Sequence, residues 1–569
     1  MDEKSQHSTN PMLNRKDPWR SQYPDSVSPK IDIDQYKNIL EVFDQAVARY
    51  TDKKSFSNFG HSYSFKQLSE KVDHFSAFLQ QELKLKKGDR IAIQIPNLLQ
   101  YPVVLFGAMK AGLIIVNINP LYTAQEMKHQ FKDSGAKCIV ILKNYAHLLE
   151  SVIKDTQIES VVVTEIGDFL PFPKNILINF VIKYVKKMVP TFHLPQQAYE
   201  LNQAMEIGRL TTFQKVEMNQ LDIVFLQYTG GTTGVSKGAI LTHRNIIANI
   251  LQICNWMRPK LKEGEEIALT PLPLYHIFSL TVNCLAFMRY GAQNILITNP
   301  RDIPAFIKEM KSSKYTVMSG VNTLYNGLMN HPDFNTIDFS QVKINVAGAM
   351  ALQKAVSEKW EKLTKTKVVE GYGLTETSPV ACCNPIDGTD RVGTIGLPVP
   401  DTWIKFVDDD GNEVIEEPGE ICVYGPQVMK GYWERPDETA KVIDKEGWFH
   451  TGDIGILDEK GFVKIVDRKK DMILVSGFNV YPNEVEDAIA SHPGVLEVAA
   501  IGVPDQHSGE IVKVVVVKKD PSLTEAVIIE HAKKSLTNYK VPKIVEFRKE
   551  LPKTNVGKIL RRALRQNPV

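Results

Sequence analysis

Residues 226–238 read Leu-Gln-Tyr-Thr-Gly-Gly-Thr-Thr-Gly-Val-Ser-Lys-Gly and combine residue types that bind phosphate. Glycines let backbone N–H groups face an anion, while hydroxyls and the ammonium group of Lys237 add donors and charge. A Walker A loop needs Gly directly before its Lys and Ser or Thr directly after it, and here those positions hold Ser236 and Gly238. An apolar run, residues 223–226, precedes the loop, so we predict nucleotide phosphate binding here rather than a flexible turn. The predicted phosphate ligands are Thr229, Gly230, Gly231, Thr232, Thr233, Gly234 and Lys237.

The elements around this loop follow an alternating pattern. From about residue 40 to residue 380, helix-period segments alternate with short β-branched runs, which predicts βαβ units and parallel sheets. Between about 385 and 467, short strands separated by Asp-Gly and Pro-Gly turns predict an antiparallel β region, and compact α+β structure follows. The predicted strands are 90–95, 113–116, 138–142, 223–226 and 511–517, and the predicted helices are 98–112, 484–490, 523–536 and one signalled by residues 242–245.

Composition excludes several classes of protein. The 569 residues are 43% hydrophobic and 24% charged, which is ordinary for a globular chain and excludes disordered and collagen-like classes. A net charge of +2 argues against a charge-driven nucleic-acid binder. Residues 533–569 nevertheless contain eleven Lys or Arg and two Glu. This basic end is either a solvated tail or a module that meets phosphates or an anionic surface.

The cysteine pattern and the N-terminus indicate a cytoplasmic protein. Six cysteines include no C-x-x-C pair, so we expect reduced, mostly buried thiols. Residues 1–20 lack an apolar signal-peptide core, and no run of 18 apolar residues predicts a transmembrane helix. No His, Cys or carboxylate cluster has zinc-site spacing, and no Gly-x-Ser-x-Gly elbow of a hydrolase is present.

One segment, residues 176–189, has the pattern of a basic amphipathic helix. Such a helix either lies on an anionic membrane surface or packs its apolar face on the core, and the second arrangement is commoner. The residues expected on its apolar face are Ile178, Val181, Ile182, Val185 and Val189, and those expected on its polar face are Asn179, Lys183, Lys186 and Lys187.

Seven motifs in a set order resemble one family. The phosphate loop is similar to that of the adenylate-forming superfamily of acyl-CoA synthetases, luciferases and peptide-synthetase adenylation domains. Within it, residues 297–303 and 468–482 are most similar to bacterial long-chain fatty acid–CoA ligases. The other motifs are Pro-Leu-Tyr-His-Ile (273–277), Gly-Tyr-Gly-Leu-Thr-Glu (371–376), His-Thr-Gly-Asp (450–453), Asp-Arg-Lys-Lys-Asp (467–471), Val-Ser-Gly-Phe-Asn-Val-Tyr-Pro (475–482) and Leu-Pro-Lys-Thr-Asn-Val-Gly-Lys (551–558).

The resemblance implies an α/β fold with a large N-terminal domain and a small mobile α+β C-terminal domain. The large domain would contain two α/β subdomains and a β-barrel-like subdomain at about 385–467. We expect a mobile leader at 1–35, the N-terminal adenylation domain at 36–469 and the C-terminal domain at 470–569.

The implied reaction has two halves. A fatty acid carboxylate attacks the α-phosphate of ATP and gives acyl-AMP and pyrophosphate, after which the thiol of CoA takes the acyl group and AMP leaves. No general base is needed, because a fatty acid is ionised near neutral pH. Cations must offset the repulsion between the two anions, and Mg²⁺ and lysine can do so.

The resemblance also implies roles for individual residues. Lys558 reaches the carboxylate and the α-phosphate, and Glu376 binds Mg²⁺ with help from Thr229 or Thr232. Lys237 contributes positive charge, and His276 positions the substrate. Gly348, Ala349 and Tyr372 would line the adenine pocket, Asp453 would bind the ribose, and Arg468 would contact the ribose or a phosphate. Further implied nucleotide-binding residues are Glu370, Gly371 and Thr375.

The second half requires a moving part. Lys470 is the implied hinge, about which the small domain removes Lys558 before CoA arrives. Gly477 and Phe478 would then line the CoA tunnel, although a strand glycine at a bulge is the alternative reading of Gly477.

Other functions remain open at this stage. Within the same family, the first alternative is a ligase for a medium-chain or aryl acid, or a fatty acyl-AMP ligase that stops before CoA. A different class is a non-catalytic, membrane-associated nucleotide-binding protein. Family members are often dimers, so a homodimer is also compatible with the resemblance.

Overall fold

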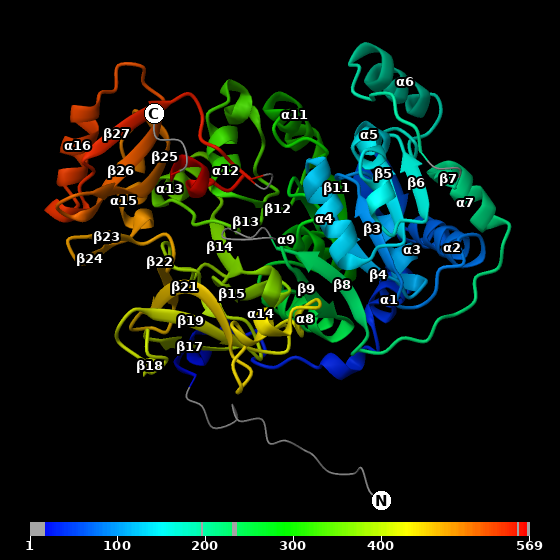
Figure 1. The fold of residues 1–569 in the computed structure, drawn as a ribbon, viewed down its shortest axis with the longest axis horizontal. Helices are drawn as coiled ribbons and strands as arrows, with labels where there is room; N and C mark the ends of the chain where they lie inside the picture. Colours follow the sequence, from blue (N-terminus) through cyan, green and yellow to red (C-terminus); the bar gives the residue numbers. More distant parts are fainter. Residues whose placement is uncertain (1–16, 195–196, 230–235, 555–556, 566–569) are drawn as a thin grey trace, which may run out of the picture.

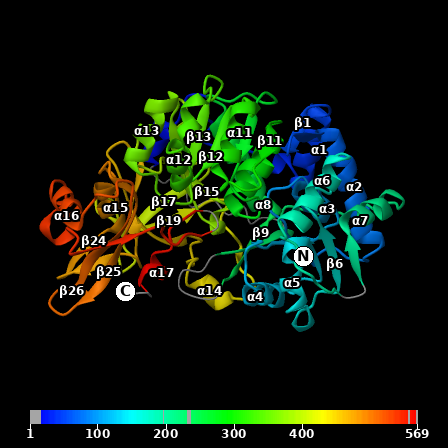
Figure 2. The ribbon, with the colours of Figure 1, turned by 90° about the horizontal axis from the view of Figure 1, so that it is seen from above.

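The computed structural model describes residues 17–194, 197–229, 236–554 and 557–565. The described chain forms two large sheets of eight and nine strands, a five-stranded antiparallel sheet and a C-terminal sheet (Figure 1). Viewed from above, the two large sheets lie side by side, and the C-terminal sheet lies beyond the second of them (Figure 2). The predicted α/β class is therefore confirmed.

The eight-stranded sheet carries the predicted phosphate loop between two of its strands. Its strand order is β20-β9-β8-β4-β3-β5-β6-β7, with parallel pairing from β8 to β7 and antiparallel pairing of β8, β9 and β20. The predicted apolar runs form its buried strands. The strands are β3 Arg90–Gln94, β4 Ile114–Asn117, β5 Cys138–Leu142, β6 Ser160–Thr164, β7 Ala198–Glu200, β8 Ile223–Tyr228, β9 Gly238–Thr242 and β20 Gly431–Tyr432. Helices in this part are α2 Phe65–Gln81, α3 Gln100–Lys110, α4 Ala124–Ser134, α5 Ala146–Glu150 and α7 Leu201–Arg209.

The nine-stranded sheet supplies the next motifs along the chain. Its order is β16-β15-β14-β13-β12-β10-β11-β1-β2, and its centre is parallel. The strands are β1 Lys54–Asn58, β2 His61–Ser64, β10 Ile267–Thr270, β11 Gln293–Leu296, β12 Val317–Gly320, β13 Ile344–Ala347, β14 Val368–Gly373, β15 Val380–Cys383 and β16 Leu397–Pro398. The helices are α1 Ile39–Tyr50, α8 His243–Met257, α9 Ile277–Ser279, the π-helix η7 Leu280–Ala286, α10 Phe287–Arg289, α11 Ile303–Ser313, α12 Asn322–Met329 and α13 Lys354–Thr364.

Helix α8 follows the phosphate loop and β9, as the sequence predicts. Thr242 caps its first turn and exchanges hydrogen bonds with Asn245 in a capping box. The amide of Asn249 donates to the carbonyl oxygen of Val380, and that of Gln252 donates to the carbonyl oxygen of Pro400, at 2.8 and 2.7 Å. These buried hydrogen bonds tie α8 to β15 and to the segment that leads into the antiparallel β region.

The antiparallel β region confirms the turn pattern of the sequence. Its strands pair antiparallel throughout, in the order β18-β17-β19-β21-β22. Asp453 on β21 pairs in register with Arg468 on β22, so two predicted ribose ligands are neighbours across the sheet. The elements are β17 Trp403–Val407, β18 Glu413–Val414, β19 Gly419–Tyr424, α14 Pro436–Ala440, β21 Phe449–Leu457 and β22 Val463–Arg468.

The C-terminal part has a hydrophobic core of its own, with the predicted helices and strand. It contacts the nine-stranded part through α12, where the amide of Asn326 donates to the carbonyl oxygen of Leu496 at 2.8 Å (Figures 1 and 2). Its elements are β23 Ile473–Val475, β24 Phe478–Val480, α15 Pro482–Ala490, β25 Val495–Asp505, β26 Gly509–Lys518, α16 Glu525–Lys533, β27 Ile544–Arg548 and α17 Arg561–Arg565.

Residues 17–35 differ from the predicted mobile leader. Trp19, Val27 and Ile33 are buried, and the backbone N–H of Ile31 donates to Asp401 at 2.8 Å. These apolar side chains remove more surface from water than a solvated leader would, which holds this stretch against the body. Residues 1–16 of the predicted leader lie outside the described residues.

The segment predicted as one amphipathic helix is divided in two. Helix α6, Lys174–Phe180, is followed by the π-helix η6, Val181–Val185, and neither contains a buried residue. Of the expected apolar face, Ile178 packs against the core, and Val181, Ile182 and Val189 are partly buried while Val185 is exposed. The expected packing on the core is therefore only partial. In the described residues, every helix is too short or too polar to cross a bilayer.

Candidate active site

A cavity of about 2100 Å³ lies where the two large sheets, the antiparallel β region and the C-terminal part meet. It collects most of the residues predicted from the motifs, although they come from distant parts of the chain. The predicted residues that line it are Thr229, Lys237, His276, Gly348, Ala349, Glu370, Gly371, Tyr372, Thr375, Glu376, Asp453, Arg468, Lys470 and Lys558.

Only the two ends of the phosphate loop belong to the described chain. The backbone N–H of Thr229 donates to the carbonyl oxygen of Lys237 at 3.0 Å, which closes the hairpin between β8 and β9. The predicted ligands between them, Gly230, Gly231, Thr232, Thr233 and Gly234, lie outside the described residues.

Lys237 is held at the edge of the cavity by two groups that the motifs do not include. Its ammonium nitrogen lies 2.7 Å from Oε2 of Glu438 on α14 and 4.7 Å from the ring centre of Tyr432. Hydrogen bonds from Lys237 and Lys441 lower the pKa of Glu438 to about 2, so this carboxylate is ionised at neutral pH. Lys237 thus points its charge toward the cavity while a carboxylate restrains it.

Glu376 is the buried carboxylate next to this pair. The hydroxyl of Tyr432 donates to its Oε1 at 2.7 Å, and burial raises the pKa of Glu376 above the usual value. Within the described residues, no group of three or more His, Cys, Asp or Glu side chains could hold a metal ion. Mg²⁺ bound to a nucleotide needs only one or two protein carboxylates, because phosphates and water supply its other ligands. Glu376 beside the phosphate loop fits that requirement.

The wall formed by β13 and β14 contains the predicted adenine residues. A side chain at Gly348 would lie 2.9 Å from the ring of Phe278, and Ala349 has a positive φ of 65°, so the backbone here leaves no room for larger groups. Glu370 is deeply placed, and burial raises its pKa to about 8. The backbone N–H of Leu352 donates to Glu370 at 3.2 Å.

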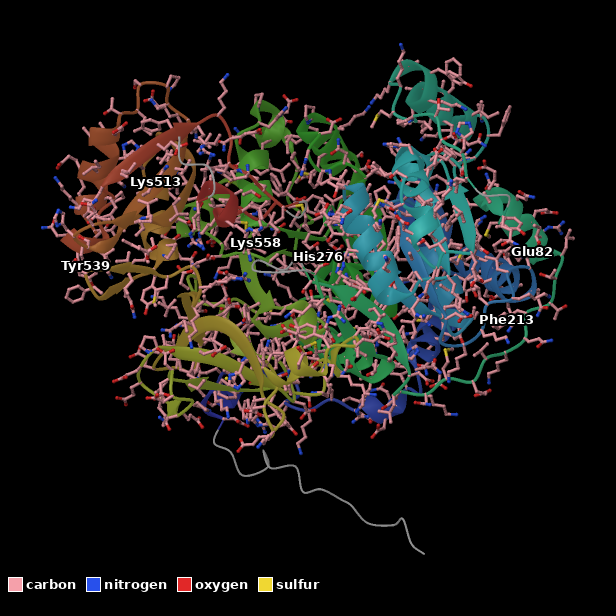
Figure 3. All side chains as sticks on the ribbon, in the orientation of Figure 1. Glu82, Phe213, His276, Lys513, Tyr539 and Lys558 are labelled. Carbon is pink, nitrogen blue, oxygen red and sulfur yellow. The ribbon has the colours of Figure 1, made fainter. Side chains whose placement is uncertain are left out.

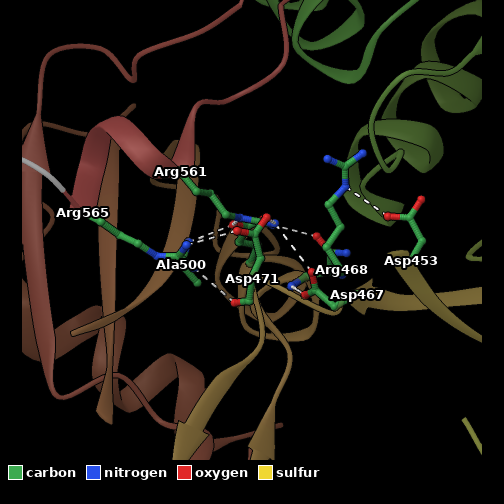
Figure 4. Close-up of polar contacts among 9 residues, drawn as sticks. Asp453, Asp467, Arg468, Asp471, Ala500, Arg561 and Arg565 are labelled. Carbon is green, nitrogen blue, oxygen red and sulfur yellow. Dashed lines mark hydrogen bonds and ion pairs between the residues drawn. The ribbon is translucent and has the colours of Figure 1, made fainter. Parts of the chain in front are cut away.

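Asp453 makes two contacts with other predicted residues. The hydroxyl of Tyr372 donates to its Oδ2 at 2.7 Å, and Nε of Arg468 lies 3.1 Å from its Oδ1 (Figure 4). Both oxygens of this buried carboxylate therefore have partners that a ribose could share or replace. Tyr372 has the additional task of orienting Asp453, which the sequence did not indicate.

Lys558 enters the cavity from the C-terminal part and faces His276 (Figure 3). Burial and the positive charges of Arg468 and Arg561 lower the pKa of Lys558 to about 7. Burial and the charge of Lys558 likewise lower the pKa of His276 to about 4. The imidazole is therefore neutral at physiological pH, consistent with positioning rather than proton donation.

Arg561 is a residue of the site that the motifs do not include, because it belongs to the basic C-terminal segment just beyond the last of them. Three positions after Lys558, its guanidinium donates to Glu486 through Nε and Nη2 at 3.0 and 2.8 Å (Figure 4). Its Nη1 lies 3.7 Å from Asp467 and 3.6 Å from Asp471, on either side of the predicted hinge. The spacing of Arg561 from Lys558 is the signal that could have indicated a positioning role.

Gly477 and Phe478 are not part of the cavity lining. Gly477 has a φ of +84° in the turn between β23 and β24, and a side chain added there would meet no described atom within 4 Å. The exposed ring of Phe478 stacks on Tyr539 at 4.9 Å between ring centres. The structure brings Lys558 into the cavity and leaves the two predicted CoA residues on the surface.

Apolar side chains from α8, η7 and the segments that follow them line part of the cavity, here named the apolar arm. The motifs do not locate it, because its walls come from elements that carry no motif. Its lining residues include Ile253, Trp256, Met257, Leu261, Val282 and Phe287.

Comparison with known proteins gives matches over almost the whole chain. Residues 43–433 match the AMP-binding enzyme family, and residues 484–558 match the AMP-binding enzyme C-terminal domain. A long-chain-fatty-acid–CoA ligase of Escherichia coli O157:H7 is 55% identical over 548 residues, covering 96% of this chain and 97% of the relative.

Two solved structures share the fold. Anthranilate CoA ligase AuaEII in complex with anthranoyl-AMP superposes with a TM-score of 0.83 at 24% identity, over 94% of this chain and 98% of that chain. ATP-bound MatB from Rhodopseudomonas palustris superposes with a TM-score of 0.79 at 27% identity, over 93% of this chain and 98% of that chain.

Proposed function

We propose, since the chain belongs to the AMP-binding enzyme family, that it is a long-chain fatty acid–CoA ligase. It converts a fatty acid and ATP to acyl-AMP and pyrophosphate, and then transfers the acyl group to CoA with release of AMP. ATP, Mg²⁺ and CoA are the cofactors and co-substrates of this reaction. The family resemblance predicted from the motifs is confirmed by both family matches.

The observation that supports this function best is the joining of two unlike regions in one cavity. Lys237, Glu376 and Asp453 make one region polar and charged, as a nucleotide requires. The apolar arm suits an alkyl chain. A fatty acid lying in this arm would present its carboxylate to the nucleotide.

In the first half-reaction, a carboxylate oxygen forms a bond to the α-phosphorus while the bond to the pyrophosphate oxygen breaks. Lys558 stabilises the negative charge that develops on the reacting oxygens, and His276 orients the acid. Substrate anions favour the ammonium form of Lys558, which counters the lowering of its pKa in the cavity.

Lys237 neutralises charge on the phosphates. Glu376, with Thr229 or Thr232, would hold Mg²⁺, which supplies positive charge to the triphosphate oxygens when bound.

Asp453 binds the ribose hydroxyls, and Tyr372 and Arg468 orient it. Adenine lies along the wall that contains Gly348 and Ala349. Arg468 also contributes charge near the phosphates.

In the second half-reaction, the thiol sulfur of CoA forms a bond to the acyl carbon, and the bond from that carbon to the AMP oxygen breaks. Lys470 serves as the hinge about which residues 470–569 rotate, removing Lys558 and bringing Gly477 and Phe478 to the entrance. The domain limits of 36–469 and 470–569 are part of this proposal. The separate hydrophobic core of the C-terminal part supports these limits. The rotation is supported by Lys558, which lies in the cavity while Gly477 and Phe478 lie outside it.

The deciding experiment is a panel of ATP–pyrophosphate exchange across acids of different chain length, each repeated with CoA. Fastest exchange with long-chain acids and acyl-CoA formation are expected. Preference for a medium-chain or aryl acid would overturn the substrate assignment, and exchange without thioester would indicate a fatty acyl-AMP ligase. Nucleotide binding with no exchange would indicate a non-catalytic protein.

The finer statements on location and partners also belong to this proposal. The enzyme is cytoplasmic, contacts an anionic membrane peripherally and forms a homodimer, with no nucleic-acid partner. The near-neutral charge of the whole chain supports the absence of a nucleic-acid partner, and its basic segments support the membrane contact.

A further inference from the structure

Residues 172–188 hold an unusual concentration of exposed apolar side chains. Among the described residues, nineteen large apolar side chains are exposed, and seven of them fall in this one segment. Each of the seven is between 49% and 79% exposed, whereas the others are scattered over the molecule. Scattered apolar residues are ordinary, but a contiguous patch indicates a binding surface. The seven residues, here named the α6 patch, are Phe172, Ile176, Leu177, Phe180, Tyr184, Val185 and Met188.

The segment is anchored to the protein by Asn179 and by the partly buried Ile178 next to it. Asn179 accepts a hydrogen bond from the backbone N–H of Gly167 at 2.7 Å and donates to Asp168 at 3.1 Å. Ile178 packs against the core beside it, while the backbone carbonyl of Met188 accepts from Asn144 at 2.9 Å. Because these contacts occupy the inward side, the α6 patch is left facing away from the core. Figure 1 shows α6 at the periphery of the molecule, beyond α5.

Charge is segregated around the α6 patch. Residues 169–199 contain four lysines and no Asp or Glu, although the whole chain is nearly neutral. The side chains of Lys183, Lys186 and Lys187 are exposed next to the patch. Glu165 and Asp168, which precede the segment, are occupied by hydrogen bonds with Asn179.

We infer that the α6 patch and its lysines dock the protein on an anionic phospholipid bilayer. The aromatic and aliphatic side chains enter the interface between headgroups and acyl chains, and the lysines meet the lipid phosphates. A protein partner could also cover apolar side chains, but the one-signed charge around the patch favours a surface of opposite sign. This inference rests on the membrane contact of the proposed function and names its surface, but it does not depend on the proposed reaction.

Vesicle flotation tests the inference with the full chain and two variants. The first replaces Phe180→Ser, Tyr184→Ser and Val185→Ser, and the second replaces Lys183→Gln, Lys186→Gln and Lys187→Gln. Leu221→Ser with Ile415→Ser is the matched control, because both side chains are at least as exposed but lie elsewhere. Vesicles of phosphatidylcholine alone and with phosphatidylglycerol are compared at low and high salt.

The unmodified protein and the control should float with the anionic vesicles, and the association should weaken at high salt. The lysine variant should bind about 100-fold more weakly at low salt, since each lysine near an anionic surface contributes to attraction. The apolar variant should lose binding to a similar degree. Equal flotation of any variant and the unmodified protein, or equal binding to neutral vesicles, would overturn the inference.

Two further measurements separate the alternatives. Molecular mass in solution is determined without vesicles, and a change of mass in the apolar variant would overturn the inference by showing that a second copy covers the patch. The rate of ATP–pyrophosphate exchange with a water-soluble acid should be the same in all variants. Equal rates would show that the variants are folded. A protein that floats as expected but lacks exchange would support the docking surface and refute the proposed reaction.

Discussion

Burial and neighbouring positive charges both lower the pKa of Lys558. The pKa of about 7 means that the free enzyme holds this lysine in a mixture of charged and neutral forms near physiological pH. An anionic substrate then stabilises the charged form at the position where the reaction develops negative charge. The cavity therefore prepares Lys558 to respond to substrate binding, which a lysine on the surface could not do.

Replacing Lys558→Ala removes the one charge that this mechanism places between carboxylate and α-phosphate. Acyl-AMP formation should fall by about 1,000-fold, in line with the loss of a charged donor at a developing anion. Thioester formation from supplied acyl-AMP should persist, because Lys558 has no role in that step. The two half-reactions are measured separately, with exposed Lys549→Ala as the control. Equal loss in both halves would reject this role.

The lowered pKa of Lys558 also predicts a pH dependence of stability. Between pH 7 and pH 10.5, the unfolded chain binds a proton at this lysine that the folded chain lacks, so the free energy of unfolding rises with pH. Below pH 7, Lys558 is charged in the folded chain, so the full cost of burying its charge lowers the free energy of unfolding. Lys558→Met should therefore raise the melting temperature most below pH 7 and least near pH 10.5. A gain that increases with pH would contradict this sign, and Lys549→Met should show no such trend.

Among the elements, the loop that carries Lys558 depends on α17 for its position. Arg561 at the start of α17 connects the loop to Glu486 on α15 and to Asp467 at the end of β22. These carboxylates are almost completely removed from water. Loss of their partner would leave buried charges unpaired, which is a large destabilisation compared with the loss of a surface ion pair.

Arg561→Ala should therefore lower the free energy of unfolding of the C-terminal part by about 3 kcal/mol and weaken its contact with Asp467. Adenylation should slow, and the pKa of Lys558 should rise because one neighbouring positive charge is gone. The pH dependence of labelling at Lys558 reports that pKa, and Arg561→Lys, which keeps the positive charge, should leave it nearly unchanged. Arg561→Lys should restore part of the rate, and Arg209→Ala, an exposed ion-paired arginine, is the control. An unchanged pKa in Arg561→Ala would argue against a positioning role.

The turn between β23 and β24 gives a test of the second half-reaction. Gly477→Leu should slow thioester formation by about 100-fold, since a side chain there would displace the CoA thiol from the acyl carbon. Acyl-AMP formation should be little affected, because Gly477 lies outside the cavity in this arrangement. Gly411→Leu is a matched control with a φ of +85° and equally open surroundings. Equal thioester rates in the two variants would count against the tunnel.

Local sequence predicted these elements to different degrees. Apolar runs placed β3, β5 and β8, and the capping residues placed the start of α8, because each signal is contained within a few neighbours. The orientation of α6 was not predictable in that way, since Asn179 faces inward only because Gly167 and Asp168 are there to receive it. Periodicity identifies two faces but does not say which one the protein covers.

At the scale of the whole molecule, motifs identified the cavity residues but not their arrangement. Lys558 and His276 are far apart in the chain, and only the docking of the C-terminal part brings them together. Gly477 and Phe478 lie outside the site for the same reason, because their location depends on how the C-terminal part is placed against the rest of the chain. The apolar arm also depends on how α8 packs against η7, which no local pattern specifies.

The N-terminal segment provides a test at this scale. Trp19 is 2% exposed and belongs to the main hydrophobic core, so residues 17–35 contribute to stability rather than forming a leader. Trp19→Ala should lower the free energy of unfolding by about 3 kcal/mol, through lost burial and an unfilled space. Denaturant titration measures this change, with the partly exposed Phe59→Ala as the control. A stability equal to that of the control would contradict the packing.

The end of β22 connects the proposed nucleotide site to the C-terminal part through two consecutive amino acids. Successive side chains on a strand point to opposite faces, so Arg468 reaches Asp453 while Asp467 turns toward Arg561. A ribose that displaces Arg468 from Asp453 would act on the same two-residue backbone segment that holds Arg561 of the C-terminal part. Departure of AMP and release of that part would then be linked events, and the enzyme could time its reopening by the loss of its own by-product.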